Sequence, residues 1–387
     1  MDSKTLIVQS GRTPIGSFEG GLSEFSAPQL GAAIISDLIN HLDIDVSAIE
    51  EVIMGNVLSA GIGQAPARQT ALYAGLPDKV ECLTINKMCG SGLKAVMLGD
   101  QAIKADGAGI IIAGGIESMS NAPYLISKRI NRFGHQKMID SMLHDGLWDV
   151  YNNIHMGSCA EMLSRDRNYT RKQQDDFSIK SYQRAQEAQE KGYFKNEITP
   201  LTNSKGDSIA IDEEPGKANF EKMPMIKPVF EKDGTITAAN ASKLNDGAAA
   251  VVLMSADSVE KYSLKPIARI LSHCSFAHDP KWFTTAPGKA IEKVLNKSGL
   301  SKQDIDLWEI NEAFAAVTMA AIDDYNLDDI KVNIHGGAVA LGHPIGASGA
   351  RILVTLINAL ERMDKNIGLA TLCIGGGEAS AMVIEKL

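Results

Sequence analysis

Residues 110–118 read IIIAGGIES, and residues 369–380 read LATLCIGGGEAS. In both stretches an apolar run ends in glycines followed by a glutamate, which is typical of a buried strand that stops at a tight turn. The two stretches lie in opposite halves of the chain. Their similarity is the first indication that the fold contains an internal repeat.

The repeat extends to the N-terminal side of both stretches. Asn56 and Asn311 each follow a strand-like run, and a Ser-Gly pair opens a helix-like segment at Gly92 and again at Gly349. The separation between the Asn and the Gly is 36 residues in the first copy and 38 in the second. Because apolar runs alternate with amphipathic stretches in each copy, the sequence predicts two copies of one α/β unit packed about a pseudo-twofold axis.

Residues 119–249 interrupt the repeat and differ from it in charge. They hold 18 Lys+Arg and 18 Asp+Glu, whereas the whole chain has 38 against 47 and a net charge of -9. A long insertion in an α/β protein is more often a lid or a binding subdomain than a separate fold, and a surface elaboration without function is the alternative. We therefore expect an N-terminal half (1–118 plus 250–265), an inserted domain (119–249) and a C-terminal half (266–387).

The composition argues against several classes of protein. A net charge of -9 over 387 residues does not suit a nucleic-acid-binding protein, which needs a basic face. No apolar run reaches the roughly 20 residues that span a bilayer. A strand-like run begins by Thr5, so we expect no targeting segment and a cytoplasmic protein. The five cysteines lack CxxC spacing, which argues against a disulfide scaffold or a zinc site.

Cys89 is the first residue that could carry chemistry. It lies in NKMCGSG, residues 86–92, directly before the helix-like segment that opens near Gly92. The positive end of a helix dipole and unpaired backbone N–H groups favour a thiolate, so we expect the pKa of Cys89 to lie below the free value of about 8.5. A buried structural cysteine is the alternative interpretation.

His343 is the second candidate. It lies in NIHGGAVALGHPIGASG, residues 333–349, where many small residues indicate a tightly turned backbone. A histidine held in such a loop could act as a base or as an N–H donor to an oxyanion. The repeat places it near the start of the second helix, as it places Cys89 near the first, so we expect the two side chains to meet across the pseudo-twofold axis.

Cys373 and Asn311 complete the set of candidates. Cys373 precedes Gly375-Gly376-Gly377 at the end of the last copy of the strand, and a polyglycine turn offers backbone N–H groups for an oxyanion hole. Asn311 and Glu312 end another strand and could orient reacting groups. Each of these features is weak alone.

Together the segments resemble the four signature elements of the thiolases. These elements are NKMCGSGLKAV around Cys89, NEAF from Asn311, NIHGGAVALGHPIGASGAR around His343 and LCIGGGEAS around Cys373. The resemblance covers essentially the whole chain and implies an α/β fold with a five-layer αβαβα core of two related halves and an inserted loop domain. Within the family, DGLWDVYNNIHMG and DGTITAANASKLNDGAAA are most similar to the acetyl-CoA acetyltransferases, or acetoacetyl-CoA thiolases.

The resemblance implies a reversible condensation of two acetyl-CoA molecules to acetoacetyl-CoA and CoA. Cys89 would take the acetyl group as a thioester, and Cys373 would be the second acid/base, acting on the α-carbon. His343 would activate Cys89 and, with a water held by Asn311, stabilise the thioester oxygen of the second substrate. The backbone N–H groups of Cys89 and Gly375 would form the other oxyanion hole. Coenzyme A is substrate and product here, and no other cofactor and no metal are implied.

The resemblance assigns CoA binding largely to the insertion, whose relative basicity suits the nucleotide phosphates. The residues that match the family's CoA and channel contacts by position are Leu147, His155, Met156, Lys217, Phe230, Ala239, Ser242, Ala313 and Phe314. Lys217 stands where relatives have an arginine. Pro215 stands where potassium-binding members carry a tyrosine, so we expect potassium activation to be weak or absent. Thr284 replaces a proline linked to the use of 2-methyl-branched substrates, so that use stays open.

Other functions stay open at this point. A degradative 3-ketoacyl-CoA thiolase of broad chain length shares these elements, although Cys-Gly-Ser-Gly and His155-Met156-Gly157 favour the short-chain class. A non-catalytic acyl-CoA-binding protein and a cysteine hydrolase represent different classes. The core of the thiolases dimerises, and residues 124–142 resemble the loop that joins two dimers. We therefore expect a homotetramer, a dimer of dimers.

Overall fold

The structure, a computed structural model, describes residues 4–105, 107–129 and 133–387. Its main element is a ten-stranded mixed sheet in the order β14-β15-β16-β13-β1-β12-β5-β3-β4, and β2 pairs with β12. The strands are β1 (Thr5–Arg12), β2 (Gly16–Ser17), β3 (Glu51–Gly55), β4 (Glu81–Ile85), β5 (Ile110–Ser118), β12 (Asn245–Ser255), β13 (Ala268–Ala277), β14 (Leu307–Ile310), β15 (Ile367–Ile374) and β16 (Glu378–Lys386).

Ten α-helices are described. They are α1 (Ala27–Asn40), α2 (Pro66–Tyr73), α3 (Ser91–Ala105), α4 (Met156–Asp166), α5 (Arg171–Glu190), α6 (Ala256–Lys261), α7 (Ala286–Ser298), α8 (Ala315–Tyr325), α9 (Ala338–Leu341) and α10 (Ser348–Arg362). Among the described residues, no helix has the length and apolar character needed to cross a membrane.

The strand order confirms the repeat that the sequence predicts. The first half runs β3-β5-β12-β1 and the second runs β14-β15-β16-β13. In each half the first pair of strands is parallel and the next two pairs are antiparallel. The halves join where β1 pairs with β13, at Leu6–Arg269 and Ile7–Ala268. The pairing of the first four strands is therefore the same on either side of this joint, and β4 extends the first half by one further strand.

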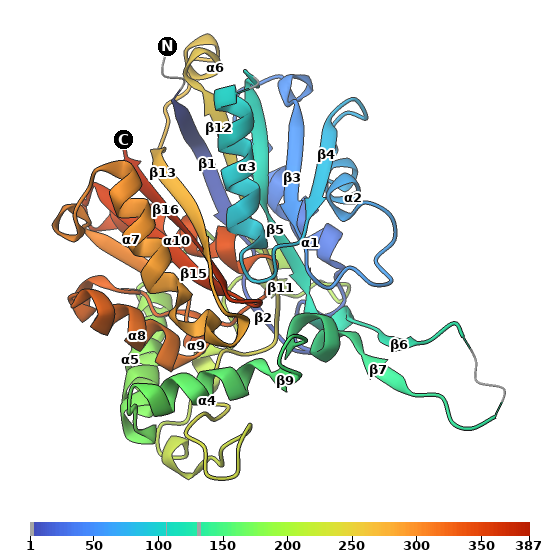
Figure 1. Cartoon of the computed structure of the whole chain (residues 1–387). Coiled ribbons are helices and arrows are strands. Elements are labelled where there is room, and N and C mark those ends of the chain that lie inside the picture. The colour runs from blue at the N-terminus through green and yellow to red at the C-terminus, as the bar shows by residue number, and fades with distance from the viewer. Residues whose placement is uncertain (1–3, 106, 130–132) are drawn as a thin grey trace.

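Helices divide the molecule into five layers (Figure 1). In the middle, α3 and α10 pack against each other, α3 on β3 and β5 and α10 on β14 and β15. On the outside, α1 and α2 cover the first half, and α7 with α8 beside it covers the second. Each interface has its own apolar core, one between the halves and one under each outer layer. The αβαβα architecture that the resemblance implies is confirmed.

The two central helices cross at the glycines that open them. A Cβ atom on Gly92 would lie 2.8 Å from the backbone nitrogen of Ala350. One on Gly349 would overlap the backbone nitrogen of Leu93 and lie 2.9 Å from its Cβ. Real Cβ atoms keep a larger distance from other heavy atoms, so only glycine fits at either position. The N-termini of α3 and α10 consequently meet at one place.

The insertion occupies the chain between Ser118 and Asn245. It contains α4, α5 and the short strands β6 (Tyr124–Ile126), β7 (Met138–Asp140), β8 (Trp148–Asp149), β9 (Ile154–His155), β10 (Leu201–Thr202) and β11 (Ser208–Ile209). A capping box begins α5, in which the side chains of Thr170 and Gln173 each accept the other's backbone N–H. Most of the insertion lies at the end of the sheet drawn at the bottom of Figure 1, whereas the β6–β7 hairpin projects away from the molecule.

Candidate active site

Cys89 lies in a tight turn between β4 and α3. Met88, directly before it, has a left-handed backbone with φ 47°. The Ser91 hydroxyl donates to the Met88 carbonyl at 2.6 Å and so holds this conformation. A Cβ on Gly90 would overlap the side chain of Ile374, at the end of β15. The turn therefore presses Cys89 against the polyglycine turn that follows β15 in the other half of the molecule.

The sequence-based prediction of a lowered pKa for Cys89 is wrong. Burial raises the pKa of the Cys89 thiol to about 11, although the backbone N–H groups of Gly375 and of Cys89 itself donate toward the sulfur and act in the opposite direction. Desolvation exceeds the effect of these donors because the second half covers the turn. Cys89 is therefore a neutral thiol at rest and needs a base to become a nucleophile.

His343 is held with one ring nitrogen free. Its side chain is buried, and Nδ1 lies 2.5 Å from the Ser348 hydroxyl, which itself donates to the Pro344 carbonyl at 2.9 Å. Because the serine proton points to that carbonyl, the network assigns the ring proton to Nδ1. Nε2 then carries a lone pair, and it is buried without a hydrogen-bond partner. Burial and the charge of Arg351 lower the pKa of His343 to about 3, so the imidazole is neutral.

Residues of the first half fix the loop that carries His343. The Asn245 Oδ1 atom accepts the backbone N–H of His343 at 2.9 Å. A carboxylate oxygen of Glu117, at the end of β5, accepts the N–H of Gly346 at 2.8 Å. Ile345 shares an apolar cluster with Cys89. The structure thus brings the two loops together at one end of the sheet, as the repeat predicts.

Asn311 and Cys373 are both buried near this point. Neither amide atom of Asn311 has a hydrogen-bond partner, although the residue is only 1% exposed. A buried amide with a free donor and a free acceptor fits a water molecule or a substrate carbonyl. Cys373 ends β15, and burial together with the neighbouring Cys89 raises the pKa of its thiol well above the usual value. Glu312 is structural, because its carboxylate accepts from the Ser181 hydroxyl at 2.7 Å and from the Asn333 amide, in the segment before α9, at 2.8 Å.

An aromatic wall leads to Cys373. The ring of His155 caps α4, since Nδ1 accepts the N–H of Gly157 at 2.9 Å, and it stacks on Phe230 with 4.6 Å between ring centroids. Phe230 meets the ring of Phe314 edge to face at 6.1 Å. Phe230 and Phe314 belong to the apolar cluster that contains Cys373, with Met156 and Ala313 as further members. Five of the residues predicted to contact CoA are thereby brought together: His155, Met156, Phe230, Ala313 and Phe314.

The other predicted CoA residues have different neighbours. The Leu147 carbonyl accepts the N–H of Met156 at 3.1 Å, and the Ser242 N–H donates to the Ala313 carbonyl at 3.0 Å, so both border the aromatic wall. Ala239 lies in an apolar cluster between α5 and α9. Lys217, with a side chain 57% exposed, uses its ammonium group to bind Ser17 and Glu214. Three further residues, Ser348, Glu117 and Asn245, hold the His343 loop. Each lies in a segment that the sequence singles out, but the sequence did not predict a role for any of them.

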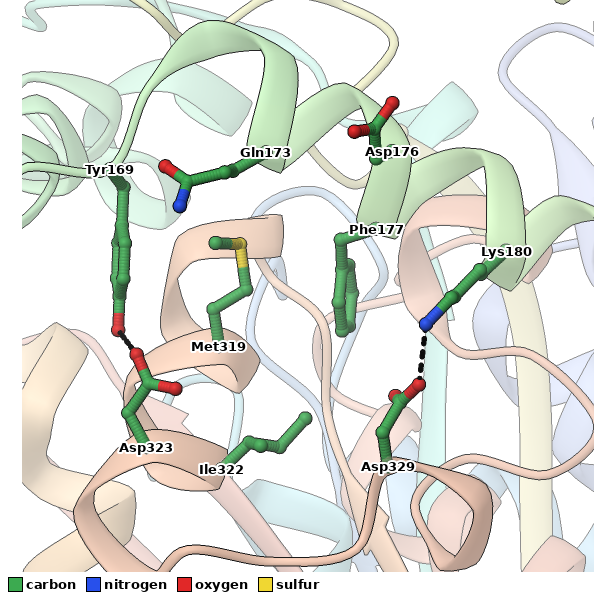
Figure 2. Close-up of a pocket in the computed structure, with 9 residues that line it drawn as sticks. All are labelled: Tyr169, Gln173, Asp176, Phe177, Lys180, Met319, Ile322, Asp323 and Asp329. Atoms are coloured by element: carbon green, nitrogen blue, oxygen red, sulfur yellow. Dashed lines mark hydrogen bonds and ion pairs between the residues drawn. The ribbon is translucent and has the colours of Figure 1, made fainter.

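A separate pocket of about 340 Å³ lies between α5 and α8 (Figure 2). Phe177, Met319 and Ile322 form its apolar floor, while its rim carries two pairs, Tyr169–Asp323 at 2.5 Å and Lys180–Asp329 at 2.7 Å. None of the residues predicted for the site lines this pocket, and these rim charges already have partners. Within the described ranges, no group of three His, Cys, Asp or Glu residues is arranged to hold a metal ion.

Comparison with known proteins identifies the family. The thiolase N-terminal domain matches residues 5–257, and the thiolase C-terminal domain matches residues 264–386. The chain belongs to the thiolase family. The resemblance seen in the sequence is thereby confirmed, and with it the assignment of this thiolase to the acyltransferases.

Several relatives of this thiolase are similar over its full length. It is 49% identical to the mitochondrial acetyl-CoA acetyltransferase of Mus musculus over 100% of this chain and 92% of that protein. It is 48% identical to the acetyl-CoA acetyltransferase of Pseudomonas aeruginosa over 98% of this chain and 99% of the relative. A crystal structure of a thiolase from Ascaris suum in complex with coenzyme A matches with a TM-score of 0.96 and 46% identity, covering 99% of this chain and 100% of that one.

Proposed function

We propose that this thiolase is an acetyl-CoA acetyltransferase, which condenses two acetyl-CoA molecules to acetoacetyl-CoA and CoA and catalyses the reverse thiolysis. The observation that carries the proposal is the placement of two cysteines of different halves at one site, Cys89 partly buried and Cys373 fully buried, with the N–H of Gly375 directed at the sulfur of Cys89. One thiol suits acyl transfer and the other suits proton transfer at carbon. Relatives that are 48–49% identical bear this name.

The first half-reaction forms a thioester on Cys89. The free Nε2 of His343 takes the thiol proton as the sulfur attacks the carbonyl carbon of acetyl-CoA. Negative charge on the carbonyl oxygen is stabilised by the N–H groups of Cys89 and Gly375. The bond from the acetyl carbon to the CoA sulfur then breaks, and the CoA thiolate receives the proton from the imidazolium ion.

The second half-reaction forms the carbon–carbon bond. Cys373 first gives its thiol proton to the neutral imidazole of His343. Its thiolate then removes a proton from the methyl group of a second acetyl-CoA, and the resulting carbanion attacks the acetyl carbon on Cys89. A raised pKa makes this thiolate a strong base. The neutral Asn311 amide, through a water, and His343 would stabilise the enolate oxygen of the second substrate. Breakage of the bond to Cys89 releases acetoacetyl-CoA, and the Cys89 thiolate takes the proton from the imidazolium ion, which restores both resting thiols. Coenzyme A is the only dissociable group that this scheme requires.

Chain-length kinetics test this function. We expect thiolysis of acetoacetyl-CoA by free CoA to have a much higher kcat/KM than thiolysis of 3-ketooctanoyl-CoA, because Phe230, Phe314 and Met156 close the apolar wall around Cys373. Comparable cleavage of the eight-carbon substrate would move the protein to the alternative, a degradative 3-ketoacyl-CoA thiolase of broad chain length. Both substrates are measured on one preparation, because inactive protein would then be recognised by its failure to cleave either of them.

The reactivity of Cys89 should be nearly independent of pH. With the pKa of His343 lowered to about 3 and that of Cys89 raised to about 11, the neutral thiol–imidazole pair persists over the whole range between these values. We expect the rate of Cys89 alkylation by iodoacetamide to be flat between about pH 5 and 9. Below this range the imidazole would gain a proton, and above it the thiol would ionise without help.

The His343→Ala variant is the matched control for that experiment. Its alkylation rate should rise about tenfold per pH unit, because only the rare thiolate then reacts. A tenfold rise per unit in the wild-type enzyme would contradict the assignment of His343 as the base.

We also propose a homotetramer in the cytoplasm. The projecting β6–β7 hairpin carries Tyr124, Ile126 and Met138, each 62% exposed, and β4 is an edge strand with Leu83 41% exposed. Apolar side chains on a hairpin and on an open edge suit two contacts between copies of the chain. Residues 130–132 of the expected tetramer loop lie outside the described residues. Light scattering that gives a dimer would remove the tetramer, and cell fractionation would test the location.

A further inference from the structure

Lys243 has no assigned role, yet its ammonium group lies among backbone oxygens of two different segments. Nζ is 3.0 Å from the carbonyl oxygen of Ala241 and 3.4 Å from that of Val339. It also lies 5.6 Å from the centroid of the Tyr182 ring, on α5. Carbonyl oxygens and an aromatic face are the groups that hold a monovalent cation without neutralising it.

The segment around Lys243 supports both halves of the candidate active site. On one side, the Ser242 N–H donates to the Ala313 carbonyl at 3.0 Å, in the loop that begins with Asn311. On the other side, Asn245 accepts the backbone N–H of His343 at 2.9 Å. A Cβ on Gly342, which has φ 110°, would overlap the Asn245 side chain. Residues 241–245 are therefore the surface on which the His343 loop rests.

Lys243 also joins residues 241–245 to α9, the helix that precedes the His343 loop. Val339 lies on α9, which leads through Gly342 to His343, and its N–H donates to Glu312 at 3.2 Å. Val339 is thus held at both of its backbone groups, the N–H by Glu312 and the carbonyl oxygen by the ammonium group of Lys243. A shift of α9 would move His343, because one glycine joins them and the loop is buried.

The ammonium group of Lys243 is surrounded mainly by neutral groups, namely two carbonyl oxygens and an aromatic ring. Burial lowers the pKa of Lys243 to about 8, and the carboxylate of Glu214 acts in the opposite direction. Glu214 hydrogen-bonds to Ser17 and Lys217, so it is shared with other groups. Desolvating an ammonium has a cost, and the two carbonyls and the Tyr182 ring offset part of it. This arrangement differs from an ordinary surface ion pair.

We propose that Lys243 is a positioning residue whose ammonium group acts as a built-in monovalent cation, joining α9 to residues 241–245 and thereby holding His343 in place for acyl transfer. The inference rests on the proposed function for its effect on turnover. Its chemical basis, a cation in a cradle of carbonyl oxygens, is independent of that function.

Chemical rescue tests the cation. Lys243→Ala removes the ammonium group and leaves the carbonyls of Ala241 and Val339 without it. We expect kcat for acetoacetyl-CoA thiolysis to fall by about 10–100-fold, because small displacements of a catalytic group have effects of that size, with little change in the KM for CoA. Ammonium or methylammonium ions should restore a large part of kcat. Tetramethylammonium is too large to approach two carbonyl oxygens, so at the same ionic strength it should not restore kcat.

Matched variants separate charge from packing. Lys243→Met keeps the length of the side chain without the charge and should be as impaired as Lys243→Ala, but without rescue, since its side chain fills the space. Lys243→Arg keeps a cation and should retain most of the activity if the protein folds. Lys232→Met, at an exposed lysine of the insertion, should behave as the wild type. Thermal midpoints of all variants show whether each is folded.

A substrate-free measurement separates this inference from the proposed function. The rate of Cys89 alkylation at neutral pH depends on His343, so it should fall in Lys243→Ala and recover with ammonium. Wild-type protein without thiolysis, but with this pattern of alkylation, would reject the function and retain the role of Lys243. An active wild type whose Lys243→Met variant has unchanged kcat, or a Lys243→Ala defect that no cation alters, would overturn the role of Lys243 alone.

Discussion

Replacing Cys89 with alanine is expected to lower kcat for acetoacetyl-CoA thiolysis by about 10⁴-fold or more, because no other nucleophile can form the covalent intermediate. Cys373 cannot substitute for it. That thiol is fully buried in the apolar cluster with Phe314, and the Gly375 N–H is directed at the sulfur of Cys89. The measurement is thiolysis by stopped-flow, together with mass spectrometry of protein quenched after mixing with acetyl-CoA. The wild type should gain one acetyl group on Cys89, and the variant none.

Two other cysteines provide the controls for this variant. Cys274, on β13, is buried and its thiol donates to the Ala290 carbonyl, whereas Cys82 on β4 is half-buried. Alanine at either position should leave kcat within about threefold of the wild type, with a small loss of stability at Cys274. Acetylation of the Cys89→Ala protein at Cys373, with turnover above about one per cent of wild type, would contradict the division of roles between the two thiols.

Gly349→Ala is expected to lower the free energy of unfolding by about 3 kcal/mol. The new methyl group would overlap the backbone of Leu93, and neither helix can move aside because α3 and α10 are enclosed between the two halves of the sheet. The measurement is the urea midpoint followed by circular dichroism. Activity should fall more steeply than stability, since the same overlap displaces the turn that carries Cys89.

Gly216→Ala is the matched control, because a Cβ at that position meets nothing within 4 Å. It should change the urea midpoint little. Gly92→Ala should resemble Gly349→Ala, and the double variant should be less destabilised than the sum of the two, since one separation of the helices relieves both overlaps. A Gly349→Ala protein with wild-type stability would show that the central helices are less tightly packed than described.

The repeat made most of the fold predictable from the sequence. Apolar runs that lead into glycines and helix openings at Gly92 and Gly349 recur in one order, and the strands and central helices of both halves follow that order. The expected turn at the glycines of residues 110–118 is wrong, because β5 stays paired with β12 as far as Ser118, and Gly115 is instead needed for the close approach of the Gly346 carbonyl. Such features are local, because glycine placement and apolar periodicity act within a few residues. The resemblance to the thiolases supplied the identity of the site residues, which spacing alone left open.

What the sequence could not predict depends on contacts between distant segments. The pKa of Cys89 was expected to fall because the start of a helix is visible in the sequence. It rises because burial of the thiol, in a turn against which the Ile374 side chain of the other half packs, exceeds the opposite effect of the Gly375 N–H. The roles of Glu117 and Ser348 depend on where the His343 loop comes to rest. Lys243 in the sequence is an ordinary lysine, and its carbonyl partners become known only when α9 is placed beside it.

The crossing of α3 and α10 also determines how many reaction centres the chain can have. A molecule made of two related halves could hold two equivalent centres, one on each side of its axis. Here the contacts between Gly92 and Ala350 and between Gly349 and Leu93 are reciprocal, so the starts of both helices lie at the axis itself. Each half therefore contributes to the same point in space. In the mechanism proposed above, this point is a single shared centre, to which one copy of the unit supplies the nucleophile and the other supplies the base.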